Sequence, residues 1–332
     1  MSASVRLTQI DGKLPNLALA RLGAWHRQQG HEVHFSRSAT RDVFEPKRYD
    51  FAYGSSIFAF SKEKVERFAA NFPEAAIGGT GVDPDGERTV EKIAPGVTDL
   101  ADFTFWPDFN ASLGYTQRGC RLKCRFCVVP KKEGANRSVG TLHDIWRGNG
   151  RPKHIHLLDN DFFGQPWWRE RIEEARTGGF KLSFSQGINV RMVTDEVAEA
   201  LASVDFRDAS FGKRRLYVAW DNLKDEGVFM RGVDTLERAG IRPTQLMAYM
   251  LIGYDRKETW ERIFHRFDAM VARGIDPYPM PFDQTSRPHK RFQRWVVTRA
   301  YRNVPFDRYD PSAKGIRFDR QGKQLDIFGE AA

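Results

Sequence analysis

The first eighty residues alternate short apolar runs with amphipathic segments. A strand is predicted over 5–10 and a helix over 16–29, where apolar residues recur at helical spacing and Gly30 ends the pattern. The remaining expected elements are strands over 32–35, 49–53 and 75–77 and a helix over 61–70. Alternating strands and helices predict a doubly wound, Rossmann-like parallel sheet.

The same alternation resumes from residue 112 with longer periods. Six strands are predicted over 113–116, 154–158, 181–185, 216–220, 246–252 and 277–281. Six helices are predicted over 141–146, 167–176, 194–202, 227–239, 258–272 and 290–301. Eight such units close a full barrel, so six predict a partial (β/α)6 barrel. The expected fold class is therefore α/β. Three prolines in 277–281 suit an edge strand.

A Gly-, Pro- and Asp-rich stretch over 78–95 is the best candidate for a domain junction. We therefore expect a Rossmann-like domain over 1–95, a barrel over 105–285, and a basic C-terminal helix and tail over 286–332.

Composition adds a cellular setting. The chain has 332 residues, of which 41% are hydrophobic. It has no apolar run of the roughly 20 residues that a membrane helix needs, and it begins without an export signal. Its three cysteines lie within eight residues of each other. This clustering favours a metal site in a reducing compartment over disulfides. We expect a soluble cytoplasmic protein without membrane contact.

Positive charge is concentrated near the C-terminus. The net charge is +9, and the segment 286–325 holds eleven Arg or Lys residues and three Asp. Cations and aromatics are mixed in Arg291, Arg294, Trp295, Arg299, Tyr301 and Arg302. Such a mixture suits a nucleic-acid partner. The alternative is a solvated helix and tail, with Trp295 on the buried face.

The cysteines form a C-x3-C-x2-C motif, Cys120, Cys124 and Cys127, directly after the first predicted barrel strand. Thiolates are the preferred ligands of iron–sulfur clusters, and three of them leave one iron of a cubane open. A closed zinc site needs four ligands. The sequence holds no fourth cysteine, and the histidines that follow lie in predicted helix or strand. Zinc and inert cysteines remain the alternatives.

This motif resembles the signature of the radical S-adenosylmethionine superfamily. Phe126 stands before the last cysteine, where that family places an aromatic residue, and the similarity covers about 112–284. The resemblance implies an enzyme whose [4Fe-4S] cluster cleaves S-adenosylmethionine to a 5′-deoxyadenosyl radical. The radical abstracts hydrogen from a substrate that the sequence does not identify, and a flavodoxin- or ferredoxin-type donor reduces the cluster. The alternative function is a non-catalytic iron–sulfur electron-transfer or nucleic-acid-binding protein, although electron-transfer ferredoxins use four cysteines.

The resemblance also implies contacts to S-adenosylmethionine at the strand ends. The candidates are Asn160 and Asp161 for the amino group, Gln186, Asn189 and Arg191 for the ribose, methionine and carboxylate, and Ile252 and Gly253 for the adenine. The structural alternatives are a helix-capping turn for Asn160 and Asp161, a scaffold ion pair for Arg191 and a tight turn for Gly253. Tyr254 and Asp255 stand where many relatives have Gly-Leu-Pro. Trp220 either lines the pocket for S-adenosylmethionine or packs in the core.

The N-terminal pattern resembles the cobalamin-binding-like domain that precedes some radical S-adenosylmethionine barrels. The D-x-H-x-x-G string that supplies an axial histidine is absent, and residues 11–16 after the first strand contain no histidine. Cobalamin binding is therefore not favoured over a scaffold or substrate-recognition role. Glycine-rich turns at 54–56 and 78–81 mark either a ligand-binding edge or ordinary β-α turns.

Overall fold

The computed structural model describes residues 2–148, 150–312, 317–318 and 324–325. The chain is mixed α/β with several parallel sheets. It divides into two compact units, residues 1–182 and 183–332, and each is described by itself. Within the described residues, no helix combines the length and hydrophobicity that crossing a bilayer requires.

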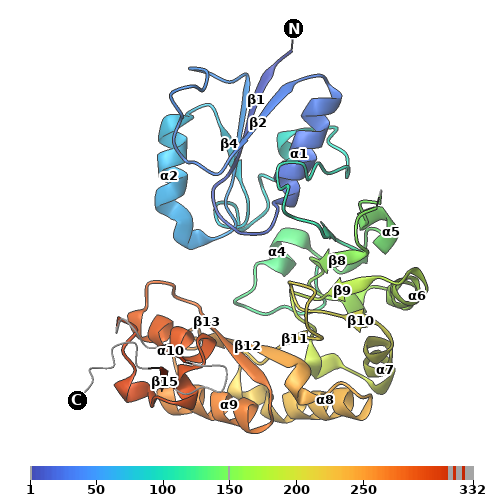
Figure 1. The fold of residues 1–332 in the computed structure, drawn as a ribbon, viewed down its shortest axis with the longest axis vertical. Coiled ribbons are helices and arrows are strands. Elements are labelled where there is room, and N and C mark those ends of the chain that lie inside the picture. Colours follow the sequence, from blue (N-terminus) through green and yellow to red (C-terminus); the bar gives the residue numbers. More distant parts are fainter. Residues whose placement is uncertain (1, 149, 313–316, 319–323, 326–332) are drawn as a thin grey trace. The chain divides into compact units, whose positions relative to one another are not determined.

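The first unit opens with a four-stranded parallel sheet in the order β2-β1-β3-β4 (Figure 1). Its elements are β1 Ser4–Gln9, α1 Leu17–Gln28, β2 Glu32–Ser36, β3 Phe51–Ser55, α2 Lys62–Asn71 and β4 Ala76–Gly78. Figure 1 shows α1 and α2 on opposite sides of this sheet. The Asn16 side chain caps α1 by accepting from Leu19 N. The predicted parallel α/β arrangement of this region is confirmed.

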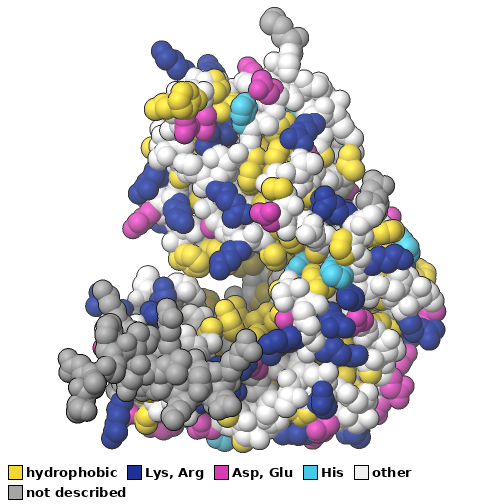
Figure 2. All heavy atoms as spheres, viewed as in Figure 1, with side chains coloured by type: hydrophobic (Ala, Val, Ile, Leu, Met, Phe, Trp, Pro, Cys, Tyr) yellow, Lys and Arg dark blue, Asp and Glu magenta, His cyan; other side chains and the backbone are white. Residues whose placement is uncertain are grey.

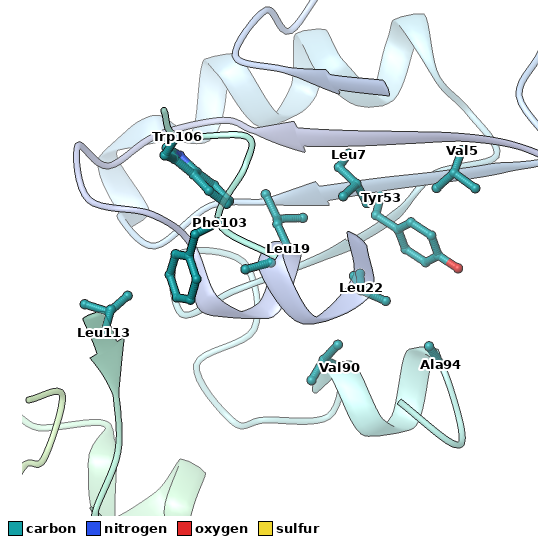
Figure 3. Close-up of a cluster of buried hydrophobic side chains, with 11 residues drawn as sticks. Val5, Leu7, Leu19, Leu22, Tyr53, Val90, Ala94, Phe103, Trp106 and Leu113 are labelled. Carbon is teal, nitrogen blue, oxygen red and sulfur yellow. The ribbon is translucent and has the colours of Figure 1, made fainter. Parts of the chain in front are cut away.

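Buried apolar side chains join the sheet to the segment that follows it. Figure 3 shows Val5, Leu7, Leu19 and Leu22 in one cluster with residues from 90–113. The added members are Val90, Ala94, Phe103, Trp106 and Leu113. Helix α3 Val90–Ile93 supplies the first of them. The stretch 78–95, which its composition marks as a junction, is thus partly packed into the N-terminal core.

The rest of the first unit contains the start of the predicted barrel. Strand β8 lies between β5 and β9 in a sheet, and β5 pairs parallel with β8. The elements are β5 Ser112–Gly114, β6 Gln117–Arg118, α4 Val129–Glu133, β7 Arg137–Ser138, α5 Leu142–Ile145, β8 His154–Leu157, α6 Trp168–Gly178 and β9 Lys181–Ser183. Strands β6 and β7 form a short antiparallel hairpin that the sequence did not reveal.

The second unit is built on the parallel sheet β11-β12-β13. Its elements are α7 Asp195–Ser203, β10 Asp205–Phe206, β11 Leu216–Ala219, α8 Glu226–Arg238, β12 Leu246–Ile252, α9 Trp260–Ala272, β13 Asp276–Pro281 and α10 Arg287–Val297. Alternate β12 side chains are fully buried, from Leu246 to Ile252. The prolines of β13 occupy every second position, and Phe282 N beyond them donates to Ile252 O. The proline nitrogens, which carry no hydrogen, therefore face away from β12. This confirms that β13 is the predicted edge strand.

Two-residue strands β14 Arg317–Phe318 and β15 Gln324–Leu325 pair antiparallel. The other residues of the expected C-terminal tail, 313–316, 319–323 and 326–332, lie outside the described part of the chain. Every predicted strand and helix is present within a few residues of its expected place. Closure of the strands into a partial barrel and the three-domain division stay predictions.

Candidate functional site

The three cysteines lie in one loop that is closed at its neck. The loop begins after β6 and returns through α4 to β7, and Gln117 pairs with Ser138 across the neck. We call residues 119–136 the cysteine loop. Cys120 N donates to Gly134 O over 3.4 Å, which brings the first cysteine close to the returning chain. A long excursion is thereby reduced to a compact loop whose ends are fixed.

Gly119 makes this closure possible. Its φ is +81°, and a Cβ at this position would overlap the backbone carbonyl of Ala135. Glu133 closes the neck further, because its carboxylate accepts from Gly119 N over 3.0 Å and pairs with Arg118 at 3.4 Å. Only glycine combines the left-handed conformation with so close a backbone approach. The residue before the first cysteine is therefore fixed by geometry.

The thiol groups are partly exposed and interact electrostatically with one another. Burial raises the pKa of Cys120, and the nearby charges of Asp161, Cys127 and Cys124 raise it further. The backbone N–H of Leu122, which donates to the sulfur over 3.4 Å, lowers this pKa and offsets part of the effect. Mutual repulsion among gathered thiolates is relieved when they ligate a cation. The chemistry of this donor set fits an iron–sulfur cluster.

No group of three or more His, Cys, Asp or Glu side chains among the described residues is arranged to hold a metal ion. A cubane cluster binds each thiolate through a different iron, so its ligands need not converge on one point. Three cysteines in one loop would therefore be sufficient to hold such a cluster.

An ion pair fastens the cysteine loop to the end of β8. Arg121, next to the first cysteine, donates from Nε to Asp161 Oδ2 over 2.8 Å and from Nη2 to Oδ1 over 2.9 Å. Its backbone N–H and the Asn136 amide also donate to Asp161 Oδ2, each over 3.0 Å. A Cβ at Gly164 would overlap all three side chains. We call Arg121, Asp161, Asn136 and Gly164 the Asp161 clamp.

A second carboxylate supports the chain just before the loop. The Asp159 carboxylate accepts from Thr116 N over 2.8 Å and from the Thr116 hydroxyl. Gln165 donates to the same hydroxyl over 3.1 Å, and Ser138 of β7 donates to Gln165 over 3.0 Å. Burial raises the pKa of Asp159 to about 7 despite these donors. The buried Asp159 carboxyl therefore holds Thr116, just before the cysteine loop, in place.

The predicted amine-binding residues differ in their surroundings. Both Asp161 oxygens are used within its clamp, while the partly exposed Asn160 side chain has no hydrogen-bond partner among the described residues. Phe126 is also partly exposed. Asn160, Asp161 and Phe126 share the first unit with the cysteines. Asp161 was predicted as a contact to the methionine amino group, and its pairing with Arg121 was not foreseen.

The other predicted contacts belong to the second unit. Gln186 is exposed beyond β9, and Asn189 accepts from Arg191 Nε over 3.1 Å. Arg191 also pairs with Asp225 at 2.9 Å, the scaffold ion pair named above as its alternative. The Asn189 Nδ2 atom is buried and finds no acceptor in the described part of the chain. That amide is the unsatisfied donor a ligand could use.

Gly253 ends β12 in a polar network. Its φ is +77°, its N–H donates to Glu258 over 2.6 Å, and a Cβ here would overlap the His289 ring. The buried Arg266 pairs with Glu258 and donates to Trp220 O over 2.8 Å and Leu251 O over 2.9 Å. These contacts fix the ends of β11 and β12. Sequence reasoning missed Glu258 and Arg266, because an acid and a base in a helical segment usually face solvent.

Three other predicted residues are part of the second unit's framework. Ile252 is fully buried. Trp220 is buried, donates to Asn222 O over 2.8 Å and stacks on Phe229, which supports the core alternative. Trp295 of α10 is also buried, and it donates to Val304 O over 2.7 Å.

In the described N-terminal sheet, no histidine follows the carboxyl ends of β1 to β4, where a base-off cobalamin would need its axial ligand. His26 lies in the last turn of α1, and His31 lies between α1 and β2. His26 is buried, and its ring nitrogens hydrogen-bond to His31 and Tyr53. At the carboxyl ends of β1 and β3, Asp11 accepts from Ser56 Oγ over 2.7 Å. Cobalamin ligated by histidine at this edge does not fit the residues present.

Comparisons with known proteins give little further identification. No family model matches the chain, and no curated protein matches it. Among solved structures, the comparison finds a spore photoproduct lyase mutant with bound AdoMet and dinucleoside spore photoproduct. The TM-score is 0.32 and the identity is 12%, over 94% of this chain and 85% of that chain. At these values neither a site nor a function is transferred.

Proposed function

We propose that this chain is a radical S-adenosylmethionine enzyme in which Cys120, Cys124 and Cys127 hold a [4Fe-4S] cluster. One observation carries the proposal: the chain gathers its only three cysteines in one loop after β5 whose neck is closed by Gly119 and Glu133. Three thiolates satisfy three irons and leave the fourth for a small-molecule ligand.

A cluster held there would supply the electron for the reductive cleavage of S-adenosylmethionine, and an external flavodoxin- or ferredoxin-type protein would be its electron donor. The protein's own task is to bind and orient. In the first unit, the Asp161 clamp fixes the cysteine loop, and the Asn160 amide oxygen would accept a hydrogen bond from the methionine amino group. In the second unit, Gln186, Asn189 and Arg191 would supply polar contacts to S-adenosylmethionine, and the backbone at Ile252 and Gly253 would contact its adenine.

Anaerobic reconstitution with iron and sulfide tests this proposal. The expected results are a broad iron–sulfur absorption and, after reduction with dithionite, 5′-deoxyadenosine formed from S-adenosylmethionine. A cluster that is reduced but never cleaves S-adenosylmethionine would support the alternative of a non-catalytic electron-transfer protein. Protein that binds no iron under these conditions would contradict both.

A further inference from the structure

Exposed apolar side chains gather where β1 and β3 end in the first unit. Leu14, Ile57, Phe58 and Phe60 have exposures of 39%, 41%, 41% and 61%. The rings of Phe58 and Phe60 stack at 4.9 Å with an interplanar angle of 12°. We call these four residues the aromatic edge. Flat aromatic surface left open to solvent at the carboxyl ends of parallel strands is typical of a ligand site.

The fold holds this edge in place. The Asp11 carboxylate accepts from Ile57 N over 2.7 Å and from Phe58 N over 3.1 Å. Gly81, in the turn after β4, packs so closely on Phe58 that a Cβ would lie 2.6 Å from its carbonyl. The backbone that presents the rings is therefore fixed before any ligand arrives, which lowers the entropic cost of binding.

Two lysines adjoin the aromatic edge along the chain. Lys13 precedes Leu14 and Lys64 follows Phe60 in the first turn of α2, and both are exposed without an acidic partner among the described residues. Asp11 is already satisfied by its three donors, and Glu63, next to Lys64 in the first turn of α2, is an exposed acid of this segment. Figure 2 shows hydrophobic and Lys or Arg side chains next to one another at the lower edge of this sheet.

The aromatic edge is also connected to the cysteine loop within the same unit. Lys132 of α4 donates to Thr80 Oγ1 over 2.7 Å, and Thr80 is the neighbour of Gly81, which packs on Phe58. The cysteine loop itself contains five Lys or Arg residues and one Glu. The turn after β4 therefore links the aromatic edge to the basic cysteine loop.

We propose that the aromatic edge binds single-stranded nucleic acid, whose bases stack on Phe58 and Phe60 and whose phosphates meet Lys13 and Lys64. Exposed rings flanked by unpaired cations are the combination that single strands require. The proposal rests on the proposed function, because it makes this nucleic acid the substrate of the radical enzyme. It places recognition in the N-terminal domain and not in the basic C-terminal region.

Fluorescence anisotropy of a labelled single-stranded oligonucleotide with the reconstituted full-length protein tests the site. Phe58→Ala and Phe60→Ala should each weaken binding about 10-fold, the usual loss when a base loses its aromatic platform. Lys13→Gln and Lys64→Gln should each lower the slope of log affinity against log salt by about 0.7. Phe44→Ala is the matched control, since Phe44 is 96% exposed and lies outside the aromatic edge.

Wild-type protein that binds no oligonucleotide, or Phe variants that bind within twofold of wild type, would overturn the proposal. Equal affinity for a duplex of the same sequence would also overturn it, because paired bases cannot stack on the rings. Self-association that Phe60→Ala abolishes would assign the edge to a protein interface instead. Failure of the proposed function would appear separately, as wild-type protein that forms no 5′-deoxyadenosine with or without oligonucleotide.

Discussion

Two regions of this chain combine cations with aromatic residues, and the fold uses them in opposite ways. In the C-terminal region, Trp295 is buried and Arg291 donates to the backbone carbonyls of Tyr309, Phe306 and Asp307. At the aromatic edge, the rings of Phe58 and Phe60 are exposed, and the neighbouring Lys13 and Lys64 have no acidic partner in the part of the chain that the structure describes.

The difference teaches that composition identifies a mixed basic and aromatic segment but not its use. An arginine whose guanidinium donates hydrogen bonds to backbone carbonyls after a helix has a structural role, whatever its charge. The C-terminal helix was the stronger nucleic-acid candidate by charge alone, yet several of its key side chains serve the core. The following predictions test this division between structural and functional residues.

The largest expected effect is functional and lies in the cysteine loop. Cys124→Ala removes a thiolate from the proposed cluster, so the iron–sulfur absorption and 5′-deoxyadenosine formation should both disappear. The free energy of unfolding of the iron-free protein should change by less than about 1 kcal/mol, since the thiol is partly exposed. Iron analysis and urea denaturation measure the two quantities, and full retention of iron would contradict the cluster assignment.

The next effect is structural and lies in the C-terminal region. Trp295→Ala should lower the free energy of unfolding by about 3–5 kcal/mol, because a large buried ring and its hydrogen bond to Val304 are lost. Trp167→Ala is the matched control, since Trp167 is 56% exposed and its loss should cost less than about 0.5 kcal/mol. Equal effects of the two substitutions in urea denaturation would break the comparison.

Asp159 should make stability depend on pH. Burial raises its pKa to about 7 in the folded protein, from 3.8. The folded state then keeps a proton that the unfolded state has lost, so stability falls as pH rises from about 4 to 7, by up to about 1.4 kcal/mol per pH unit.

Asp159→Asn removes this slope. The lowered pKa values of His26 and His156, each about 4, act in the opposite direction. Urea denaturation at several pH values should therefore show a difference between wild type and variant that changes with pH. A constant difference from pH 4 to 7 would show that this carboxyl does not titrate there.

A smaller effect is expected at the Asp161 clamp. Gly164→Ala places a methyl group where the Arg121, Asp161 and Asn136 side chains meet, which should cost about 1–3 kcal/mol and speed the loss of iron to a chelator. Gly227→Ala is the control, because its Cβ would meet only the flexible end of Arg231 in α8. Iron release as slow as in wild type would argue against a positioning role of the clamp.

The smallest effects compare two arginines of one helix. Arg291→Ala removes three hydrogen bonds to backbone carbonyls and should cost about 1–2 kcal/mol. Arg294→Ala changes an exposed side chain without a partner among the described residues and should cost less than about 0.5 kcal/mol. Thermal unfolding measures both, and a larger loss for Arg294→Ala would reverse their assigned roles.

Much of the fold could be predicted because the local signals agree with the tertiary structure. The strand 246–252 was found as β12, where alternate residues are fully buried, and the prolines of β13 indicated an edge. The β6 and β7 hairpin escaped prediction because each strand has two residues and no periodicity. Of the candidate site, the cysteines were identifiable by spacing. The Arg121–Asp161 pair was not, since its partners are 40 residues apart.

The sequence by itself determined the order of strands and helices and the cluster of cysteines, because each depends on residue type and local spacing. Only the tertiary structure decided which charges are satisfied. In the folded chain Trp295 is buried, Arg291 donates to backbone carbonyls, and Arg121 pairs with Asp161. Phe58 and Phe60 remain exposed. Burial and pairing depend on distant neighbours, and a pattern along the chain does not contain them.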